Sequence, residues 1–221
     1  MKKKVYPEKI RQEDEHRIEH AGQLWQTKEY VLTAPVQGPL AERIHEERNA
    51  FSRNYRHPLL ATDAQIWLIH FWQWETQEKR VMAYFSMLAA PQPSLLLEID
   101  GFGFMPSHSI ILKIRNASAV AELVKSFRPM QRMLKSLASK PHFITEPYLL
   151  FASRLKPWQY EKSVPEYQQK SFAGRCVVQE LSLWKKDDHQ KAFRQIARFP
   201  LQTASSAEGA AGGQIQYSLF D

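Results

Sequence analysis

The chain has 221 residues, 43% of them hydrophobic and 24% charged, which is the composition of a folded globular protein with a sizeable core. Its single cysteine, Cys176, excludes an intramolecular disulfide and a cysteine-rich zinc site, and no apolar run is long enough to span a membrane. The formal net charge of +7 favours a polyanionic partner or an anionic ligand. The basic N-terminus is not followed by an apolar segment, so we expect no secretory signal and a cytoplasmic protein.

Strands and helices alternate along the predicted domain. Residues 29–35 are expected to form the first strand, and Pro39 then opens a helix that ends near Tyr55. A second strand within residues 61–74 precedes a helix over 75–89. The remaining expected elements are a strand at 95–99, a glycine turn at 100–103, a strand at 109–115, a helix at 117–139, a strand at 148–152, a loop with Trp158 and Tyr160, a helix or turn at 165–170, and strands at 175–184 and 192–201.

The two ends of the chain have a different character. Residues 1–28 alternate charges without a clean apolar face, which predicts a poorly ordered arm or a peripheral helix. Residues 203–213 are small and almost uncharged, which is typical of a flexible tether. We therefore expect one domain over residues 29–201 and a tail over 202–221.

The strand expected at 148–152 is the most informative stretch. It is entered through Pro147 and is followed by Arg154. This pattern resembles the second signature strand of the 2H phosphoesterases, the superfamily of 2'-5' RNA ligases and cyclic phosphodiesterases, which runs Pro-His-hydrophobic-Thr and often continues to an Arg. Here Tyr148 stands in place of the His and Leu150 in place of the Thr.

The resemblance extends over residues 29–201 and implies an α+β fold of two lobes, with two antiparallel sheets facing a central cleft and helices outside. In the family, one His-x-Thr/Ser motif per lobe faces that cleft, since residues two apart on a strand point the same way. The two His would act as general base and general acid on a phosphodiester. The best register for the first motif puts Gln65 in place of the His and Trp67 in place of the Thr.

All four family positions would then have lost their chemistry. Glutamine and leucine exchange no proton near neutral pH, and a tyrosine, with an ordinary pKa of about 10, is a poor base. Trp67 and Leu150 would also occupy the volume that the phosphate needs. Two other histidines do not fit the missing positions. Counting from Gln65 places His70 on the opposite face of its strand, and His142 lies before the strand expected at 148–152. No metal-ligand cluster or glycine-rich phosphate loop is visible, so we expect no metal and no cofactor.

A cleft without catalysis can still bind. Trp67 and Tyr148, with Trp72 and Trp74, are side chains on which bases stack, and Arg154 and Arg175 suit phosphate. We therefore predict a protein that binds a nucleotide or an RNA phosphate. Two alternatives stay open at the cleft: the aromatic rings fill it as core, or an active phosphodiesterase uses His108, Tyr148 and Arg154 instead.

The tail carries a third possibility. The sequence Gln216-Tyr217-Ser218-Leu219-Phe220 resembles the bacterial sliding-clamp-binding peptide, Gln-x-Ser/Asp-Leu-Phe. Leu219 and Phe220 would fill an apolar pocket of the clamp and Gln216 would bond at its rim, with the tether supplying reach. The alternatives are a tail that packs on the protein's own surface or one that binds nothing.

Overall fold

The computed structural model describes residues 27–60, 62–106, 108–136, 139–186 and 192–203. Residues 1–26 of the arm expected over 1–28, and the tail from residue 204 onward, including Gln216, Leu219 and Phe220, lie outside the described residues; Thr27 and Lys28 belong to the first strand and not to an arm. No helix of the described chain is long and apolar enough to cross a membrane.

The described chain forms an α+β fold built on one curled sheet. The strands are β1 (Thr27–Pro35), β2 (Gln65–Trp74), β3 (Leu95–Met105), β4 (Ser109–Ile114), β5 (His142–Phe143), β6 (Tyr148–Ala152), β7 (Ala173–Val178), β8 (Glu180–Lys186) and β9 (Phe193–Pro200). The helices are α2 (Pro39–Tyr55), α3 (Glu78–Ala89), α4 (Ala117–Ser126), α5 (Gln131–Leu134) and α6 (Pro157–Gln169), with short 3₁₀ turns at Glu75–Gln77 and Arg128–Met130.

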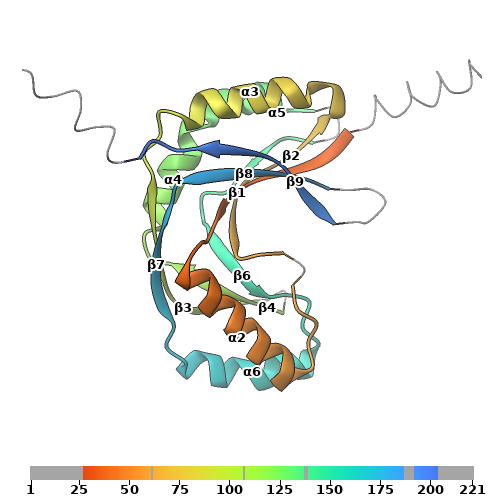
Figure 1. Ribbon diagram of the computed structural model, residues 1–221. Helices are drawn as coiled ribbons and strands as arrows, with labels where there is room; N and C mark the ends of the chain where they lie inside the picture. The colour runs from red at the N-terminus through yellow and green to blue at the C-terminus, as the bar shows by residue number, and fades with distance from the viewer. Residues whose placement is uncertain (1–26, 61, 107, 137–138, 187–191, 204–221) are drawn as a thin grey trace, which may run out of the picture.

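The strand order is β7-β3-β4-β6-β2-β1-β8-β9, with β5 added to β2, and these pairings are antiparallel. The first four strands form one lobe, with α2 and α6 packed on it, and the others form the second lobe. Figure 1 shows α3 and α5 at one end of the molecule and α2 and α6 at the other, with the sheet curving between them. The expected fold of two lobes is confirmed, and the two sheets are joined into one where β2 meets β6.

Aromatic contacts fix the helices to one face of this sheet. In the second lobe, Phe71 of β2 stacks on Tyr30 at 5.2 Å and packs against Phe85 of α3 at 6.0 Å. In the first lobe, the ring of Tyr167 on α6 lies 4.9 Å from that of Phe102 on β3. The opposite, concave face of the sheet is therefore the one free to form a site.

Helix α2 follows its sequence signals. Pro39 stands at the start, where its missing N–H costs no hydrogen bond, and the helix ends at Arg56 with a left-handed backbone (φ 49°) whose N–H bonds to Ser52. Leu40, Ile44, Arg48, Phe51 and Tyr55 are buried along one side. The helix expected from Pro39 is confirmed, and its buried stripe contains one charged residue.

Two expected elements are wrong in kind. The glycine turn at 100–103 is part of β3, because Gly101 adopts a left-handed φ of 74° and the pairing with β4 shifts between Ile99 and Phe102. The loop expected around Trp158 and Tyr160 is the first part of α6, which begins at Pro157. Proline is favourable at that first helical position, so the signal taken for a loop is a helix start.

Two other elements are divided. The strand expected over 175–184 is two strands, β7 and β8, separated at Gln179. The helix expected over 117–139 ends at Ser126, and Pro129 lies in a 3₁₀ turn before the short α5. A proline in a helix interior removes a backbone donor and clashes with the preceding turn, which accounts for this break.

Candidate functional site

One residue pair of the described chain joins the sheets of the two lobes. Ile66 of β2 lies opposite Leu149 of β6, and both side chains are fully buried on the helix-covered face. Because neighbouring residues of a strand point to opposite faces, the residues flanking this pair turn to the concave side. There they line one pocket of about 190 Å³, which we call the interlobe pocket; its lining comprises Arg48, Thr62, Asp63, Gln65, Trp67, Ile144, Tyr148 and Leu150.

All four positions singled out from the sequence are therefore in one place. Gln65 and Trp67 come from β2, and Tyr148 and Leu150 come from β6. The two aromatic rings do not close the pocket as core, since Trp67 is 39% exposed and Tyr148 38% exposed. A flat ring from each lobe is thus accessible within the same pocket.

Gln65 is held by a chain of hydrogen bonds. Trp184 Nε1 donates to Thr33 Oγ1 at 3.1 Å, and Thr33 Oγ1 donates to Gln65 Oε1 at 3.0 Å. Thr33 and Gln65 are both buried, so this arrangement is shielded from water. The carbonyl of Ser182, 3.3 Å from Thr33 Oγ1, is a second acceptor for the same hydroxyl proton, and these contacts hold the Gln65 amide at the wall of the pocket.

Arg48 of α2 reaches both lobes beneath the pocket. Its Nη1 donates to the carbonyl of Thr62 at 3.1 Å and its Nη2 to the carbonyl of Leu150 at 2.5 Å. The side chain is only 8% exposed, and this burial lowers the pKa of Arg48. The nearby Asp63 carboxylate raises the pKa by a smaller amount, so that it lies at about 10. The guanidinium therefore remains charged at neutral pH, and its buried Nε has no acceptor among the described residues.

The sequence analysis did not select Arg48 as a site residue. The signal was its place in the apolar stripe of α2, in helical register with Ile44, Phe51 and Tyr55. A lone arginine in such a stripe is a buried charge, which requires partners.

His70 lies on the same face as Trp67, and the expectation that it points the opposite way is wrong. The β1–β2 register slips by one residue, since Leu32 pairs with Ile69 but Thr33 pairs with Trp67. This β-bulge inverts the alternation for the rest of β2. The rings of Trp67 and His70 consequently stack, with centroids 5.8 Å apart.

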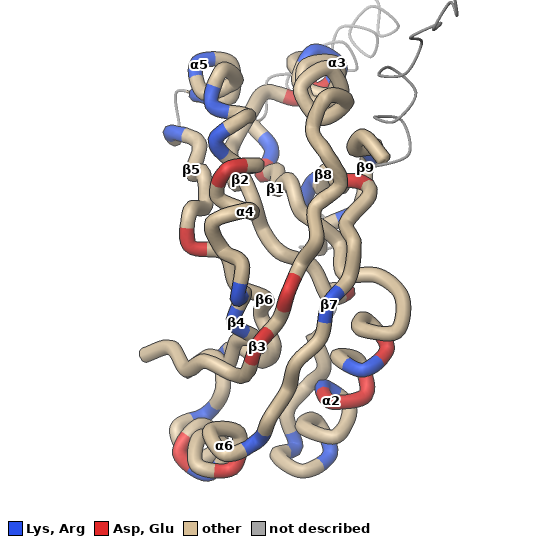
Figure 2. The backbone as a smooth tube through the Cα atoms, turned by 90° about the vertical axis from the view of Figure 1, so that its left-hand side faces the viewer, with Lys and Arg blue, Asp and Glu red and all other residues tan. Residues whose placement is uncertain are grey.

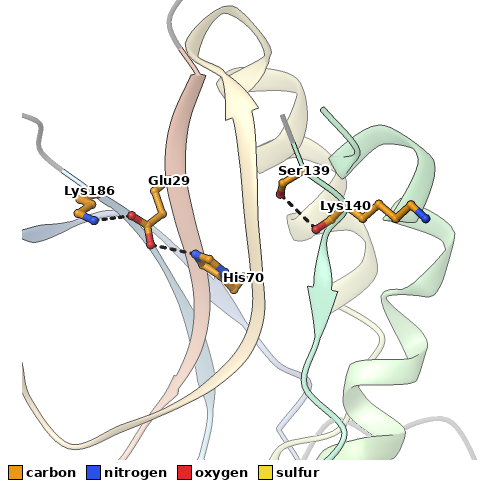
Figure 3. Close-up of polar contacts among 5 residues, drawn as sticks. All are labelled: Glu29, His70, Ser139, Lys140 and Lys186. Carbon is orange, nitrogen blue, oxygen red and sulfur yellow. Dashed lines mark hydrogen bonds and ion pairs between the residues drawn. The ribbon is translucent and has the colours of Figure 1, made fainter. Parts of the chain in front are cut away.

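A hydrogen bond to Glu29 holds His70 beside Trp67. Glu29 accepts from His70 Nε2 at 2.9 Å and from Lys186 Nζ at 2.6 Å, and Figure 3 shows the carboxylate between the two. The ring of Phe193 packs edge-on against that of Trp67, with centroids 5.8 Å apart. His70 does not line the interlobe pocket; it supports the orientation of Trp67.

Comparison with solved structures identifies the architecture. TT0787 of Thermus thermophilus superposes with a TM-score of 0.62 at 16% sequence identity, and E. coli LigT complexed with 3'-AMP with 0.56 at 15%. A crystal structure described as a phosphoesterase gives 0.55 at 14%. Each alignment covers 80% of this chain and 99% of the other. The chain has the fold of the 2H phosphoesterases. No protein-family model matches the sequence, and no curated protein matches it either.

The remaining sequence candidates lie elsewhere on this 2H fold. His108 is exposed in the turn between β3 and β4, where its ring packs on Tyr160 at 5.2 Å. Arg154 is exposed after β6 and lines a separate pocket. Trp72 and Trp74 lie farther along β2, and Arg175 on β7; none of these residues lines the interlobe pocket.

A second, larger cavity adjoins the interlobe pocket but has another character. It has a volume of about 660 Å³ and shares Arg48, Thr62, Asp63 and Gln65 with the interlobe pocket. Its walls carry four carboxylates, those of Glu42, Glu46, Asp63 and Glu180, and two arginines, Arg48 and Arg198, so we call it the acidic cleft. Figure 2 shows that basic and acidic residues both occur along α2. Among the described residues no group of three or more His, Cys, Asp or Glu side chains could hold a metal ion.

Proposed function

We propose that this protein binds a nucleotide or an RNA phosphate in the interlobe pocket and has lost the phosphodiesterase reaction of the 2H fold. One observation carries the proposal: each lobe contributes one accessible ring, Trp67 or Tyr148, to a pocket that contains the buried guanidinium of Arg48. Aromatic rings stack bases of any sequence, and guanidinium groups recognise phosphate. Structures of E. coli LigT with ATP, 3'-AMP and NADP+ support a nucleotide ligand for this fold.

Arg48 is placed to meet an anion. Its Nη1 donates to Thr62 and its Nη2 to Leu150, and each of these nitrogens carries a second N–H. A phosphate oxygen that enters the pocket would accept from one of these second N–H groups and would compete with the Asp63 carboxylate for the guanidinium.

The residues at the four positions support the proposed loss of catalysis. General acid–base catalysis needs groups that change protonation in place near the working pH. Gln65 and Leu150 carry no such group, and no histidine among the described residues lines the interlobe pocket. The alternative, an active enzyme that uses His108, Tyr148 and Arg154, would require groups from separate places, because only Tyr148 of these three lines the pocket.

Calorimetric titration with 3'-AMP and ATP tests this proposal. Trp67→Ala and Tyr148→Ala should each weaken binding about 5- to 150-fold, since base stacking contributes about 1–3 kcal/mol. Trp158→Ala is the matched control, because Trp158 is 49% exposed on α6 and does not line the pocket. Absence of nucleotide binding by the wild type, or equal loss in all three variants, would overturn the proposal.

From the sequence we also propose recruitment to a sliding clamp through Gln216, Leu219 and Phe220, which lie outside the described residues. The match of the tail to the Gln-x-Ser/Asp-Leu-Phe pattern supports this idea. Deletion of residues 214–221, and separately Leu219→Ala/Phe220→Ala, should abolish retention on an immobilised clamp. Undiminished retention of both variants would contradict it.

A further inference from the structure

A basic pocket lies beside the interlobe pocket. It has a volume of about 530 Å³, and its charged lining consists of Arg56, Arg154 and Lys156, all of them exposed; His57 is the only other titratable side chain among the described residues that line it. We call this pocket the basic basin. No acidic residue of the described chain contributes to its wall, in contrast to the acidic cleft.

The three cations of the basin are unpaired in the described chain. None of Arg56, Arg154 and Lys156 forms an ion pair with a described residue. Elsewhere the described lysines Lys185 and Lys186 each contact a glutamate within 2.7 Å. The positive potential of the basin is therefore not cancelled locally, and the N-terminal end of α6 adds to it.

Buried contacts hold the two sides of the basin together. Gln159 of α6 is 3% exposed, and its Nε2 donates to the carbonyls of Tyr55 at 2.8 Å and Arg56 at 3.3 Å. Its Oε1 accepts from the backbone N–H of Lys156 at 2.8 Å. One buried side chain thus fixes the position of Arg56 relative to Lys156 before any ligand arrives.

Both arginines have an uncommon backbone conformation. Arg56 and Arg154 have φ values of 49° and 57°, in the left-handed region that non-glycine residues seldom adopt. For Arg56 the helix C-cap explains this conformation, whereas Arg154 lies between β6 and α6 without such a role. Backbones of this kind concentrate at ligand clamps and binding sites.

The basin and the interlobe pocket are neighbours. Thr62 lines both, and it also lines the acidic cleft, so the three cavities meet at this residue. A polyanionic chain that leaves the interlobe pocket has two directions available. Glu42 and Glu46 disfavour the acidic cleft, where Glu180 is paired with Arg198 at 3.5 Å, and the three cations favour the basin.

We propose that the basic basin binds the backbone phosphates of a single-stranded oligonucleotide whose terminal nucleotide occupies the interlobe pocket. Stacking rings beside a basic groove are the usual means by which proteins hold single strands. This inference rests on the proposed function and makes it more specific: the ligand is an oligonucleotide and not a mononucleotide. The phosphate nearest the pocket would meet Arg48, and the next would meet Arg56 and Arg154.

The test compares a labelled single-stranded RNA hexamer with 3'-AMP, each titrated at several salt concentrations. The variant Arg56→Asn/Arg154→Asn removes two charges, and asparagine tolerates the left-handed backbone of both sites. The matched control Arg132→Gln/Lys135→Gln removes the same charge from exposed residues at and just after α5, near the end of the molecule opposite α2 and α6 (Figure 1). Circular dichroism and urea unfolding verify that both variants fold.

The wild type should bind the hexamer at least about tenfold more tightly than 3'-AMP. The basin variant should lower the slope of log K against log salt by roughly 1.4, at about 0.7 per lost phosphate contact, and leave 3'-AMP affinity unchanged. The control variant should keep the wild-type slope. Equal slopes for the two variants, with 3'-AMP still bound, would overturn this inference alone. If the wild type bound neither ligand, the proposed function would fail with it.

Discussion

Ile66 of β2 lies directly opposite Leu149 of β6, and this is the one pairing between these strands in the described chain. Through it the sheets of the two lobes become continuous. Because both side chains are buried on the helix-covered face, Trp67 and Tyr148 beside them turn together to the concave face. The pair that joins the lobes therefore also sets the geometry of the interlobe pocket.

Truncation of this pair should affect both stability and binding. Leu149→Ala leaves a cavity at a fully buried position, and we expect a loss of about 2–5 kcal/mol in the free energy of unfolding. Affinity for 3'-AMP should fall as well, because Tyr148 and Leu150 lose their register with β2. Leu134→Ala, at an equally buried position on α5, is the control and should lower stability without lowering the affinity of the folded protein. Urea unfolding and calorimetry provide the two measurements, and equal affinities for both variants would contradict the prediction.

Arg48 should contribute substantially to stability. Arg48→Met fills similar volume but leaves the carbonyls of Thr62 and Leu150 without their donor. We expect the free energy of unfolding to fall by roughly 2–4 kcal/mol. Each lost hydrogen bond to the charged group costs about 1.5–3 kcal/mol, and removal of the buried charge offsets part of this cost. Arg48→Lys should recover part of the loss. Urea unfolding decides the matter, and a change below about 0.5 kcal/mol would refute the assignment of Arg48 as the link between the lobes.

His57 predicts a pH dependence of stability. Burial lowers the pKa of His57 below its ordinary value of 6.5, against a hydrogen bond to the Ser153 backbone that raises it. The unfolded chain then binds the proton more readily than the folded one, so stability falls as pH drops from 6.5 toward the lowered pKa. In His57→Gln this component should be absent. We measure urea unfolding of wild type and variant at pH 7.5, 6.5 and 5.5. The free energy of unfolding of the wild type, relative to that of the variant, should decrease as the pH is lowered. A difference that stays constant across the three pH values would contradict the prediction.

Gly174 should not tolerate a side chain. A Cβ at this position on β7 would lie 2.4 Å from Leu40 Cδ1, and Leu40 is 4% exposed at the start of α2. Gly174→Ala is expected to cost about 1–3 kcal/mol of stability by overpacking. In a Leu40→Ala background the same change should cost much less, so a double-mutant cycle would show strong coupling. If the effects of the two substitutions on stability were additive, the overlap with Leu40 would not be the reason that position 174 requires glycine.

The parts of the fold that the sequence predicted are those with strong local signals. The helix from Pro39 and the strand at Tyr148–Ala152 combine a clear hydrophobic pattern with a boundary residue, and both are present. The α+β fold of two lobes also followed from the resemblance to the 2H phosphoesterases. The expectation that failed most instructively concerns His70, since counting alternate residues along a strand assumes that no bulge intervenes. The slip opposite Leu32 and Thr33 depends on pairing with another strand and leaves no local pattern.

The candidate site was predictable only in part. The register that placed Gln65, Trp67, Tyr148 and Leu150 at the family's positions came from the resemblance, and the structure brings all four into one pocket. Arg48 was not foreseen, and of the basic basin only Arg154 was selected from the sequence. Their residues come together only when the end of α2, the segment after β6 and the start of α6 are tied by the buried hydrogen bonds of Gln159 and Arg48. Such long-range contacts are not specified by any local spacing.

The central claim is that the interlobe pocket binds without cleaving. The most direct measurement follows one sample of purified protein with a labelled RNA that ends in a 2',3'-cyclic phosphate, recording fluorescence anisotropy for binding and chromatography for product. We predict saturable binding that Trp67→Ala weakens, and no ring opening above a blank without protein. Turnover by the wild type that Tyr148→Phe abolishes would contradict the loss of catalysis, and the absence of any binding would contradict the proposed function itself.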